Sequence, residues 1–169
     1  MSNTVAEHKA QAPQAVRCAV VTISDTRTLA NDTGGSEIVA RLKEAGHQIA
    51  LRVIVPDEPD CIRELLSEAR DRPDIDAVLL TGGTGISSRD QTYDTVSGLL
   101  TKPLPGYGEL FRMLSYAEIG AAAMLSRATG GLIGRTVVLT MPGSRAAVRL
   151  AMEKIILPEL GHLVREASR

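Results

Sequence analysis

Short runs of apolar, largely β-branched residues are the feature of this sequence that most restricts its fold. The first is VRCAVVTI at residues 16–23, and similar runs occupy residues 48–55, 76–81 and 136–141. Runs of this kind are typical of strands that are buried on both faces, as they are in a parallel sheet. We therefore predict a strand at each of these four places.

Helical patterns separate the runs. Apolar residues recur there three and four positions apart, as on the buried face of a helix. Helices are expected at about residues 38–45, 62–69, 92–100, 109–118, 147–155 and 158–166. Residues 101–108, rich in proline and glycine, should interrupt the helical pattern. The alternation predicts an α/β fold, with a single doubly wound, mostly parallel sheet and helices on both of its faces.

Length and composition favour one domain. The chain has 169 residues, of which 44% are hydrophobic, enough for a sizeable core. We expect the domain at residues 15–169, after a flexible polar tail at residues 1–14. Nothing resembles a signal peptide or a membrane helix. The two cysteines, Cys18 and Cys61, form no C-x-x-C pair and are expected to be buried free thiols in a cytoplasmic protein.

Charge and aromatic content argue against a nucleic-acid partner. The formal net charge is −1 and aromatic residues make up 2% of the chain. Nucleic-acid binders usually carry a basic excess or aromatic stacking platforms. The three histidines share no zinc-ligand spacing. We expect neither nucleic acid, nor a membrane, nor zinc among the binding partners.

Ligands of open α/β sheets bind beyond the carboxyl ends of the strands. Four loops at those ends carry small, polar or acidic residues: Ser24-Asp25, Pro56-Asp57, residues 81–90 and Pro142-Gly143-Ser144. The simpler interpretations are a turn for the first loop and helix N-caps for Asp57 and Ser144. The alternative is one ligand site that is shared between the loops.

The loop at residues 81–90, TGGTGISSRD, is the most informative of the four. Its glycines can present backbone N–H groups to an anion, and its hydroxyl residues and Arg89 can add hydrogen bonds to phosphate. Asp90 would repel phosphate unless Mg²⁺ bridged the two. The loop therefore predicts a nucleotide site with a metal ion. The alternative is a tight strand-to-helix turn in which Asp90 caps the next helix.

Known phosphate motifs do not fit this loop. A P-loop needs a lysine that is absent here, and the G-x-G-x-x-G pattern fails at Ser88. A dinucleotide-dependent oxidoreductase is a weak alternative, because its glycines would follow an early strand. A purely structural assembly domain is another, but it leaves the four unusual loops unexplained.

The series Thr81-Gly82-Gly83-Thr84-Gly85, followed by Arg89-Asp90-x-Thr92, resembles the signature of the MoaB/MogA family of molybdenum cofactor biosynthesis proteins. The other matches, in the family's order, are Ser24-Asp25, Asp32-x-Gly34, Pro56-Asp57, Pro105-Gly106 through Phe111-Arg112, Ser126-Arg127 and Pro142-Gly143-Ser144. The resemblance covers about residues 16–163. Several separate motifs make it specific.

The resemblance implies a homotrimer or homohexamer that adenylylates molybdopterin with ATP and Mg²⁺ and releases pyrophosphate. A molybdenum-insertion protein of the pathway is an implied partner. Asp57 and Asp90 would be catalytic and would help to hold Mg²⁺. The implied ligand-binding residues are Ser24, Asp25, Thr81, Gly82, Gly83, Thr84, Gly85, Arg89, Thr92, Ser126, Arg127, Pro142, Gly143 and Ser144.

One departure from the family pattern lies after Thr92. Adenylyltransferases of the family have Pro-Glu there, whereas this chain has Tyr93-Asp94. The segment from Phe111 to Ser115 is more similar to MoaB than to MogA. The alternative function is therefore a non-catalytic molybdopterin-binding carrier or scaffold of the same pathway.

Overall fold

A computed structural model describes residues 12–169, and it contains one sheet of six strands in the order β2-β1-β3-β6-β5-β4. The strands are β1 (Arg17–Ile23), β2 (Gln48–Val55), β3 (Ala77–Thr81), β4 (Lys102–Pro103), β5 (Gly130–Ile133) and β6 (Thr136–Met141). Strands β2, β1, β3 and β6 are parallel, whereas β5 and β4 add an antiparallel edge. The predicted mostly parallel α/β sheet is confirmed.

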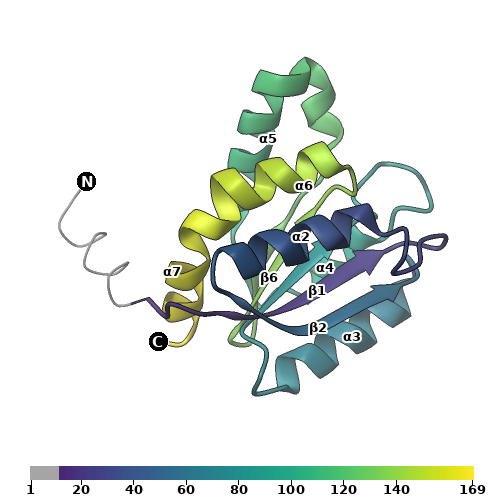
Figure 1. The fold of residues 1–169 in the computed structure, drawn as a ribbon. Coiled ribbons are helices and arrows are strands. Elements are labelled where there is room, and N and C mark those ends of the chain that lie inside the picture. The colour runs from purple at the N-terminus through teal and green to yellow at the C-terminus, as the bar shows by residue number, and fades with distance from the viewer. Residues whose placement is uncertain (1–11) are drawn as a thin grey trace.

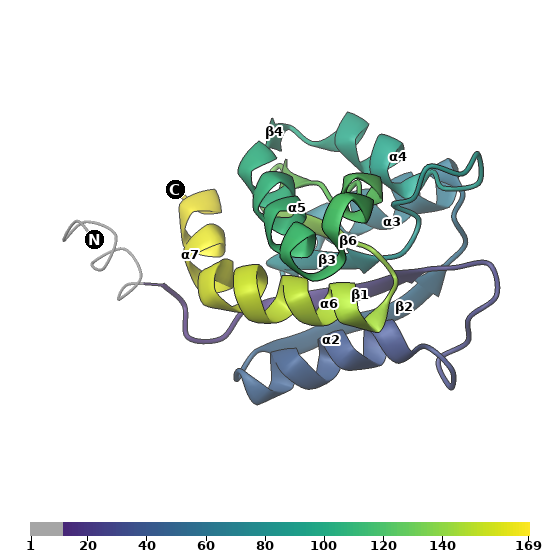
Figure 2. The same ribbon diagram turned by 90° about the horizontal axis from the view of Figure 1, so that it is seen from above.

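Helices cover both faces of the sheet (Figures 1 and 2). They are α2 (Thr33–Glu44), α3 (Pro59–Asp71), α4 (Thr92–Leu99), α5 (Pro105–Ile119), α6 (Arg145–Ala151) and α7 (Leu157–Ala167). Alternate residues of β1 point to opposite faces: Val20 packs in a core with α2, α5, α6 and α7, and Val21 in a core with α3 and α4. This period of two explains why β1 is apolar throughout.

Two short strands were absent from the sequence prediction. β4 has only two residues, one of them proline, and β5 begins with two glycines. Both are poor strand formers, and the pairing of β5 with β6 holds them in the sheet. Helix α5 also begins at Pro105, within the expected break, because proline is tolerated in the first turn.

The two helices expected at the C-terminus form one continuous helical run. A π-helical turn, Met152–Ile156, joins α6 to α7. Earlier in the chain, most of the expected tail, residues 1–11, lies outside the described residues. The last residues of that expected tail contact the domain, since Ala12 and Pro13 lie against Gly161 of α7.

The cysteines are free, as predicted, although only Cys18 is fully buried and Cys61 is partly exposed. Burial raises the pKa of the Cys18 thiol to about 12, so this thiol remains protonated and unreactive near neutral pH. Across residues 12–169, no helix combines the length and apolarity that crossing a membrane requires.

The chain order of the strands places a topological switch point between β1 and β3. The connection from β1 to β2 runs through α2 on one face, and the connection from β2 to β3 crosses β1 with α3 on the other face. The loops that follow β1 and β3 therefore leave the carboxyl ends of these two neighbouring strands toward opposite faces of the sheet. Ligand sites of doubly wound folds form at such a point.

An ion pair between Arg17 and Asp76 lies at the amino ends of the strands, opposite the loops. Asp76 accepts hydrogen bonds from the backbone N–H of Arg17 (2.9 Å) and from its guanidinium (2.6 and 2.9 Å). These contacts lower the pKa of the Asp76 carboxyl, with the side-chain hydrogen bond as the largest cause. The pair ties the start of β1 to the start of β3.

We expect Asp76→Asn to lower the urea midpoint of unfolding at pH 7. Because folding lowers the pKa of Asp76, its contribution is present above the ordinary aspartate value of about 3.9 and is lost as the pH falls through the lowered value. The difference between the two proteins should therefore shrink in acid. A difference that stays constant down to the lowered pKa would contradict this account.

Candidate functional site

The predicted loops meet at the carboxyl edge of the parallel strands. The N–H of Gly82 donates to Met141 O (3.0 Å), and the Thr81 hydroxyl donates to Pro142 O (3.2 Å). Gly143 lies close to Gly82, since a Cβ added at Gly143 would be 3.6 Å from Gly82 Cα. Parallel pairing of β3 with β6 brings these loops together.

Two glycines of the loop after β3 are required by its conformation. Gly82 and Gly83 have φ angles of 107° and 63°, which side chains rarely adopt. A Cβ at Gly82 would overlap the carbonyl oxygen of Ile23. A Cβ at Gly83 would overlap the hydroxyl of Thr92 and the carboxylate of Asp57. The loop backbone thus lies against both neighbouring loops.

Asp57 is buried, with 6% of its surface exposed, and does not cap the helix that follows it. The N-cap of α3 is Glu58, which makes no side-chain cap bond. Asp57 Oδ1 instead accepts from the N–H of Gln91 (3.2 Å) and from the hydroxyl of Thr92 (3.1 Å), at the start of α4. Oδ2 faces Gly83. Asp57 therefore anchors the glycine loop to α4.

The surroundings of Asp57 raise the pKa of its carboxyl above the ordinary value, and so favour the neutral form. Burial is the largest cause that raises the pKa of this carboxyl, and the Asp90 carboxylate raises it further. The hydrogen bonds from Thr92 and Gln91 and the charge of Arg89 act in the other direction. A buried acid with a raised pKa, coupled to a second acid, is a common feature of functional sites.

Asp90 closes the turn before α4. Its Oδ2 accepts from the N–H of Ser87 (3.0 Å), and its own N–H donates to Ser87 O (2.9 Å). The N-cap of α4 is Gln91, so the alternative in which Asp90 caps that helix is wrong. The carboxylate also lies against Gly85, where an added Cβ would be 2.6 Å from Oδ2.

Arg89 points away from the loop backbone and contacts two other loops. Its Nε and Nη2 donate to the two carboxylate oxygens of Asp25 (2.7 and 2.8 Å), and Nη1 donates to Glu58 (2.6 Å). These contacts raise the pKa of Arg89 and lower that of Asp25. The guanidinium expected to meet phosphate is thus engaged by carboxylates.

Arg127 holds the same loop from the other side. Its guanidinium donates to Gly85 O (2.6 and 2.9 Å) and to Asp90 O (3.3 Å). It also pairs with Asp94 (3.0 Å) and lies 4.8 Å from the ring centre of Tyr93. Tyr93 and Asp94, the residues that depart from the family pattern, are therefore direct partners of Arg127. The preceding residue, Ser126, closes a turn through its N–H to Ala123 O (3.1 Å).

The loop after β6 contains the predicted N-cap. The hydroxyl of Ser144 accepts from the N–H of Ala147 (3.2 Å) at the start of α6. This is the simpler of the two interpretations drawn from the sequence, and it is confirmed. The hydroxyl hydrogen of Ser144 is not used in that bond.

Sequence reasoning missed Asp32 as a site residue, although its motif with Gly34 was noted. Asp32 is 3% exposed and caps α2 by accepting from the N–H of Gly35 (2.9 Å). Its other oxygen accepts from the hydroxyl of Thr22 (2.9 Å) and from Arg52 (3.3 Å). It also missed Glu58, whose only sequence signal is its place beside Asp57.

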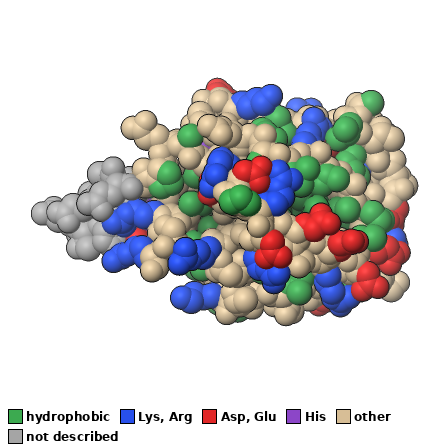
Figure 3. Space-filling view, turned by 90° about the horizontal axis from the view of Figure 1, so that it is seen from below, with side chains coloured by type: hydrophobic (Ala, Val, Ile, Leu, Met, Phe, Trp, Pro, Cys, Tyr) green, Lys and Arg blue, Asp and Glu red, His purple; other side chains and the backbone are tan. Residues whose placement is uncertain are grey.

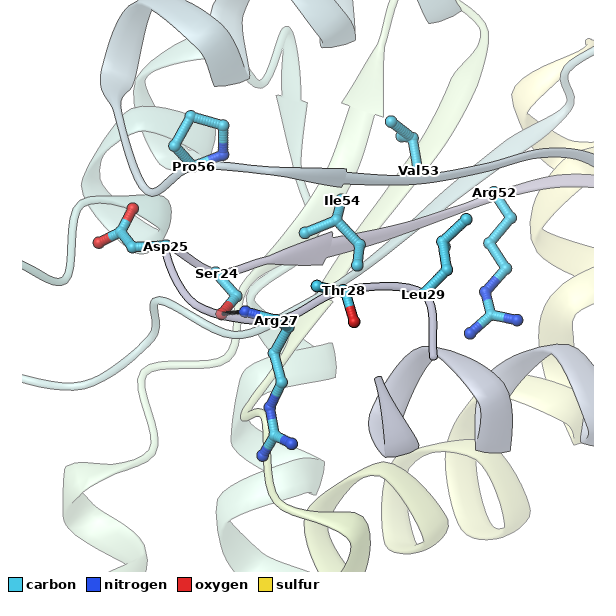
Figure 4. A pocket seen from close by; sticks show the side chains of 9 residues that line it. All are labelled: Ser24, Asp25, Arg27, Thr28, Leu29, Arg52, Val53, Ile54 and Pro56. Carbon is cyan, nitrogen blue, oxygen red and sulfur yellow. Dashed lines mark hydrogen bonds between the residues drawn. The ribbon is translucent and has the colours of Figure 1, made fainter. Parts of the chain in front are cut away.

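Two hollows adjoin these loops. A pocket of about 190 Å³ is lined by residues of three strand ends, including Ser24, Thr81, Gly82 and Gly143. A wider groove of about 550 Å³ lies beside it, between β2 and the loop after β1. Figure 4 shows Asp25 and Pro56 at one end of this groove and Arg52 at the other.

Charges around the molecule are mixed. On the face drawn in Figure 3, basic and acidic side chains are interspersed, and the acidic ones are more frequent toward the side to which β1 and β2 point. The loops at the carboxyl ends of the strands carry the acids Asp25, Asp57, Glu58 and Asp90, which their hydrogen bonds and charge interactions place near one another. A polyanion would find no uniformly basic surface on that face.

Asp57 and Asp90 are the acids at this edge that could hold Mg²⁺, together with a phosphate. Within residues 12–169, no group of three or more His, Cys, Asp or Glu is arranged to hold a metal ion. Asp57 Oδ2 and the Asp90 carboxylate provide two acids on adjacent loops. Mg²⁺ is usually held in this way, by one or two carboxylates together with substrate phosphates and water.

Fold and site together define a class, the doubly wound α/β domains with a glycine-rich loop and paired acids at the switch point of the sheet. Residues 19–162 match a family described as a probable molybdopterin binding domain. Molybdenum cofactor biosynthesis protein B of Bacillus cereus is 55% identical over 167 residues, which are 98% of this chain and 99% of that protein. This chain belongs to the molybdenum cofactor biosynthesis protein B (MoaB) family, as its motifs predicted.

Solved structures agree with this assignment. A crystal structure of molybdenum cofactor biosynthesis protein B has a TM-score of 0.91 at 55% identity and covers 94% of this chain and 99% of its own. MoaB of Pyrococcus furiosus, described as a tungsten cofactor synthesizing protein, has a TM-score of 0.83 at 36% identity and covers 94% and 100%. The fold is therefore shared with MoaB proteins.

Proposed function

We propose that this protein adenylylates molybdopterin with ATP and Mg²⁺ and releases pyrophosphate. The observation that carries the proposal is the position of Asp57 and Asp90. Both acids lie against the glycine loop, Asp57 through Gly83 and Asp90 through Gly85, at the switch point of the sheet. Nucleotidyl transfer needs aligned phosphates and charge neutralisation more than a covalent contribution from the protein.

In the proposed reaction, an oxygen of the terminal phosphate of molybdopterin attacks the α-phosphorus of ATP. A new P–O bond forms, and the bond from that phosphorus to the β-phosphate bridging oxygen breaks. The electron pair leaves with pyrophosphate, and adenylylated molybdopterin remains. Mg²⁺, held by Asp57 and Asp90, would neutralise phosphate charge when bound.

The other residues would hold the reactants. Gly82 already donates its N–H to Met141 O, so the loop would offer phosphate oxygens the backbone N–H groups of Gly83, Thr84 and Gly85. Ser24, Thr81 and Gly143 line the 190 Å³ pocket, and Ser144 starts a helix beside it. Asp25 and Arg127 keep the loop in place through the contacts described above.

Pyrophosphate release from Mg-ATP, measured with and without molybdopterin, tests this proposal. We expect release that depends on both molybdopterin and Mg²⁺. Release without the pterin would indicate hydrolysis of ATP to AMP and pyrophosphate, in which water attacks the α-phosphorus in place of the pterin phosphate. No release, with molybdopterin binding intact, would establish the alternative function, a carrier or scaffold that binds the pterin without reaction.

One observation favours that alternative. Both arginines that the motifs supply near the glycine loop are engaged by protein acceptors: Arg89 by Asp25 and Glu58, and Arg127 by Asp94 and loop carbonyls. A catalytic site would ordinarily leave cations available for the transferring phosphates. Tyr93 and Asp94, which replace the adenylyltransferase Pro-Glu, contribute to this arrangement.

We also propose that the protein works as a homotrimer or homohexamer in the cytoplasm and passes its product to a molybdenum-insertion protein. Apolar side chains on α5 and the adjoining 3₁₀ segment, Gly120–Leu125, support the assembly. Those at least 48% exposed there are Leu110, Met113, Tyr116, Ile119, Met124 and Leu125. Large exposed apolar surfaces of this kind usually mark an interface.

Light scattering at micromolar concentration should report the mass of a trimer or a hexamer of the 18.0 kDa chain. The double substitution Met113→Lys and Tyr116→Lys should shift the mass toward the monomer, because it places charge in the apolar surface. The control Leu29→Lys, which changes an exposed leucine elsewhere, should leave the mass unchanged. A monomeric wild-type protein would contradict the prediction.

A further inference from the structure

Arg89 connects three loops that are far apart in the sequence. Its guanidinium forms a bidentate pair with Asp25, in the loop after β1, and a single bond to Glu58, in the loop after β2. Arg89 itself belongs to the loop after β3. Each of the three side chains is between 38% and 51% exposed, so the contacts lie at the surface of the site.

The residues beside these contacts are the two proposed catalytic acids. Asp57 lies next to Glu58 in the chain, and Asp90 lies next to Arg89. The N–H of Asp57 donates to Asp25 Oδ1 (3.2 Å), the same oxygen that receives Nη2 of Arg89. One guanidinium is therefore linked, through two carboxylates, to the backbones that carry both acids.

The link places the positive charge of Arg89 among several carboxylates. The three loops bring Asp25, Asp57, Glu58 and Asp90 to one edge, and like charges at short range repel each other. Arg89 contacts two of these acids directly. Arg89 therefore places one positive charge, in a defined bidentate geometry, between the loops that carry Asp57 and Asp90.

We propose that Arg89 is a positioning residue, which fixes the spacing of Asp57 and Asp90 through Asp25 and Glu58, and that it does not itself bind phosphate. The inference rests on the proposed adenylyl transfer. A bidentate arginine–carboxylate pair has a defined geometry. Exposed ion pairs contribute little to global stability. Substitution of Arg89 should therefore impair the reaction and leave the fold intact.

The two roles of Arg89 make opposite predictions for its partners. If Arg89 positions the loops, removing a partner charge should impair the reaction in the same way as removing Arg89. If Arg89 binds phosphate, Asp25 and Glu58 compete with ATP for the guanidinium. Removing them would then strengthen ATP binding, whereas removing Arg89 would weaken it.

The test compares Arg89→Gln, Arg89→Lys, Asp25→Asn and the double variant Arg89→Gln with Asp25→Asn. We expect Arg89→Gln to lower kcat about 10- to 100-fold, because small misplacements of reacting groups cost rates of that order. KM for ATP should change by less than about threefold. Arg89→Lys should recover little, since an ammonium cannot form the bidentate pair.

Asp25→Asn should lower kcat in the same direction, and the double variant should be no slower than Arg89→Gln alone, because partners in one contact are not additive. The matched control is Arg72→Gln. Arg72 forms an exposed bidentate pair with Asp74 (3.0 and 2.7 Å) before β3, at the opposite edge of the sheet. It should behave as the wild-type protein. A lower KM for ATP in Asp25→Asn, with a higher KM in Arg89→Gln, would overturn the proposal.

Amide hydrogen exchange gives a second readout that needs no activity. Exchange of the Asp90 and Gln91 amides should quicken in Arg89→Gln and Asp25→Asn but not in Arg72→Gln, because the first two loosen the loop. Unchanged exchange at both amides would overturn the proposal. Should the wild-type protein release no pyrophosphate, adenylyl transfer would fail as the function, and exchange alone would decide the role of Arg89.

Discussion

Asp90→Asn should reduce pterin-dependent pyrophosphate release about 10²- to 10³-fold, the usual effect of removing one preorganised charge from such a site. The substitution is nearly isosteric. An asparagine oxygen can still accept from the N–H of Ser87, so the turn before α4 should persist. The loss would therefore report the missing charge and not a collapsed loop.

Two controls accompany this prediction. Asp60→Asn changes an acid that is 98% exposed on α3 and should leave the rate unchanged. Molybdopterin binding by Asp90→Asn should stay close to that of the wild-type protein, since the glycine loop is intact. If Asp90→Asn keeps a near-normal rate, the role assigned to Asp90 is wrong.

Gly83→Ala should lose both stability and ligand binding. Gly83 has φ +63°, and an added Cβ would overlap the Thr92 hydroxyl and the Asp57 carboxylate. A strained backbone position of this kind costs about 1–3 kcal/mol of unfolding free energy, and the overlap adds to that cost. Because the loop must also move away from Asp57, we expect affinity for molybdopterin and ATP to fall at least about tenfold.

The matched control is Gly98→Ala in α4, where an added Cβ meets no atom within 4 Å. Alanine is the better helix former, so this variant should be as stable as the wild-type protein or up to about 1 kcal/mol more stable. Urea unfolding and isothermal titration measure the two effects separately. A stable Gly83→Ala protein with full affinity would show that the loop can adopt another conformation at no cost.

Much of the fold could be predicted because it depends on local patterns. The strands β1, β2 and β6 lie where the apolar runs predicted them, within one residue at each end, and β3 starts one residue later. Their burial on both faces leaves a signal in the sequence itself. By contrast, β4 and β5 are strands only because of backbone bonds to β6 and to each other, which no local pattern encodes.

The site shows the same division. Glycines followed by Arg-Asp, and an acid after each of two strands, were enough to select the loops. The partners of those residues were not predictable. The simpler interpretation of Asp57 made it the N-cap of its own helix, yet it anchors α4, 34 and 35 residues later in the chain. Nor could the sequence show that Arg89 pairs with Asp25, 64 residues earlier.

The sequence by itself determined the alternation of strands and helices, the loops that carry the chemistry and the MoaB family. These follow from periodicity, from glycine's freedom at positive φ and from motif order. Only the tertiary structure decided which side chains share a hydrogen bond and which acids lie together. Those contacts depend on the order of the strands in the sheet, which brings segments that are distant in the sequence to the same end of the sheet. They exist only in the folded chain.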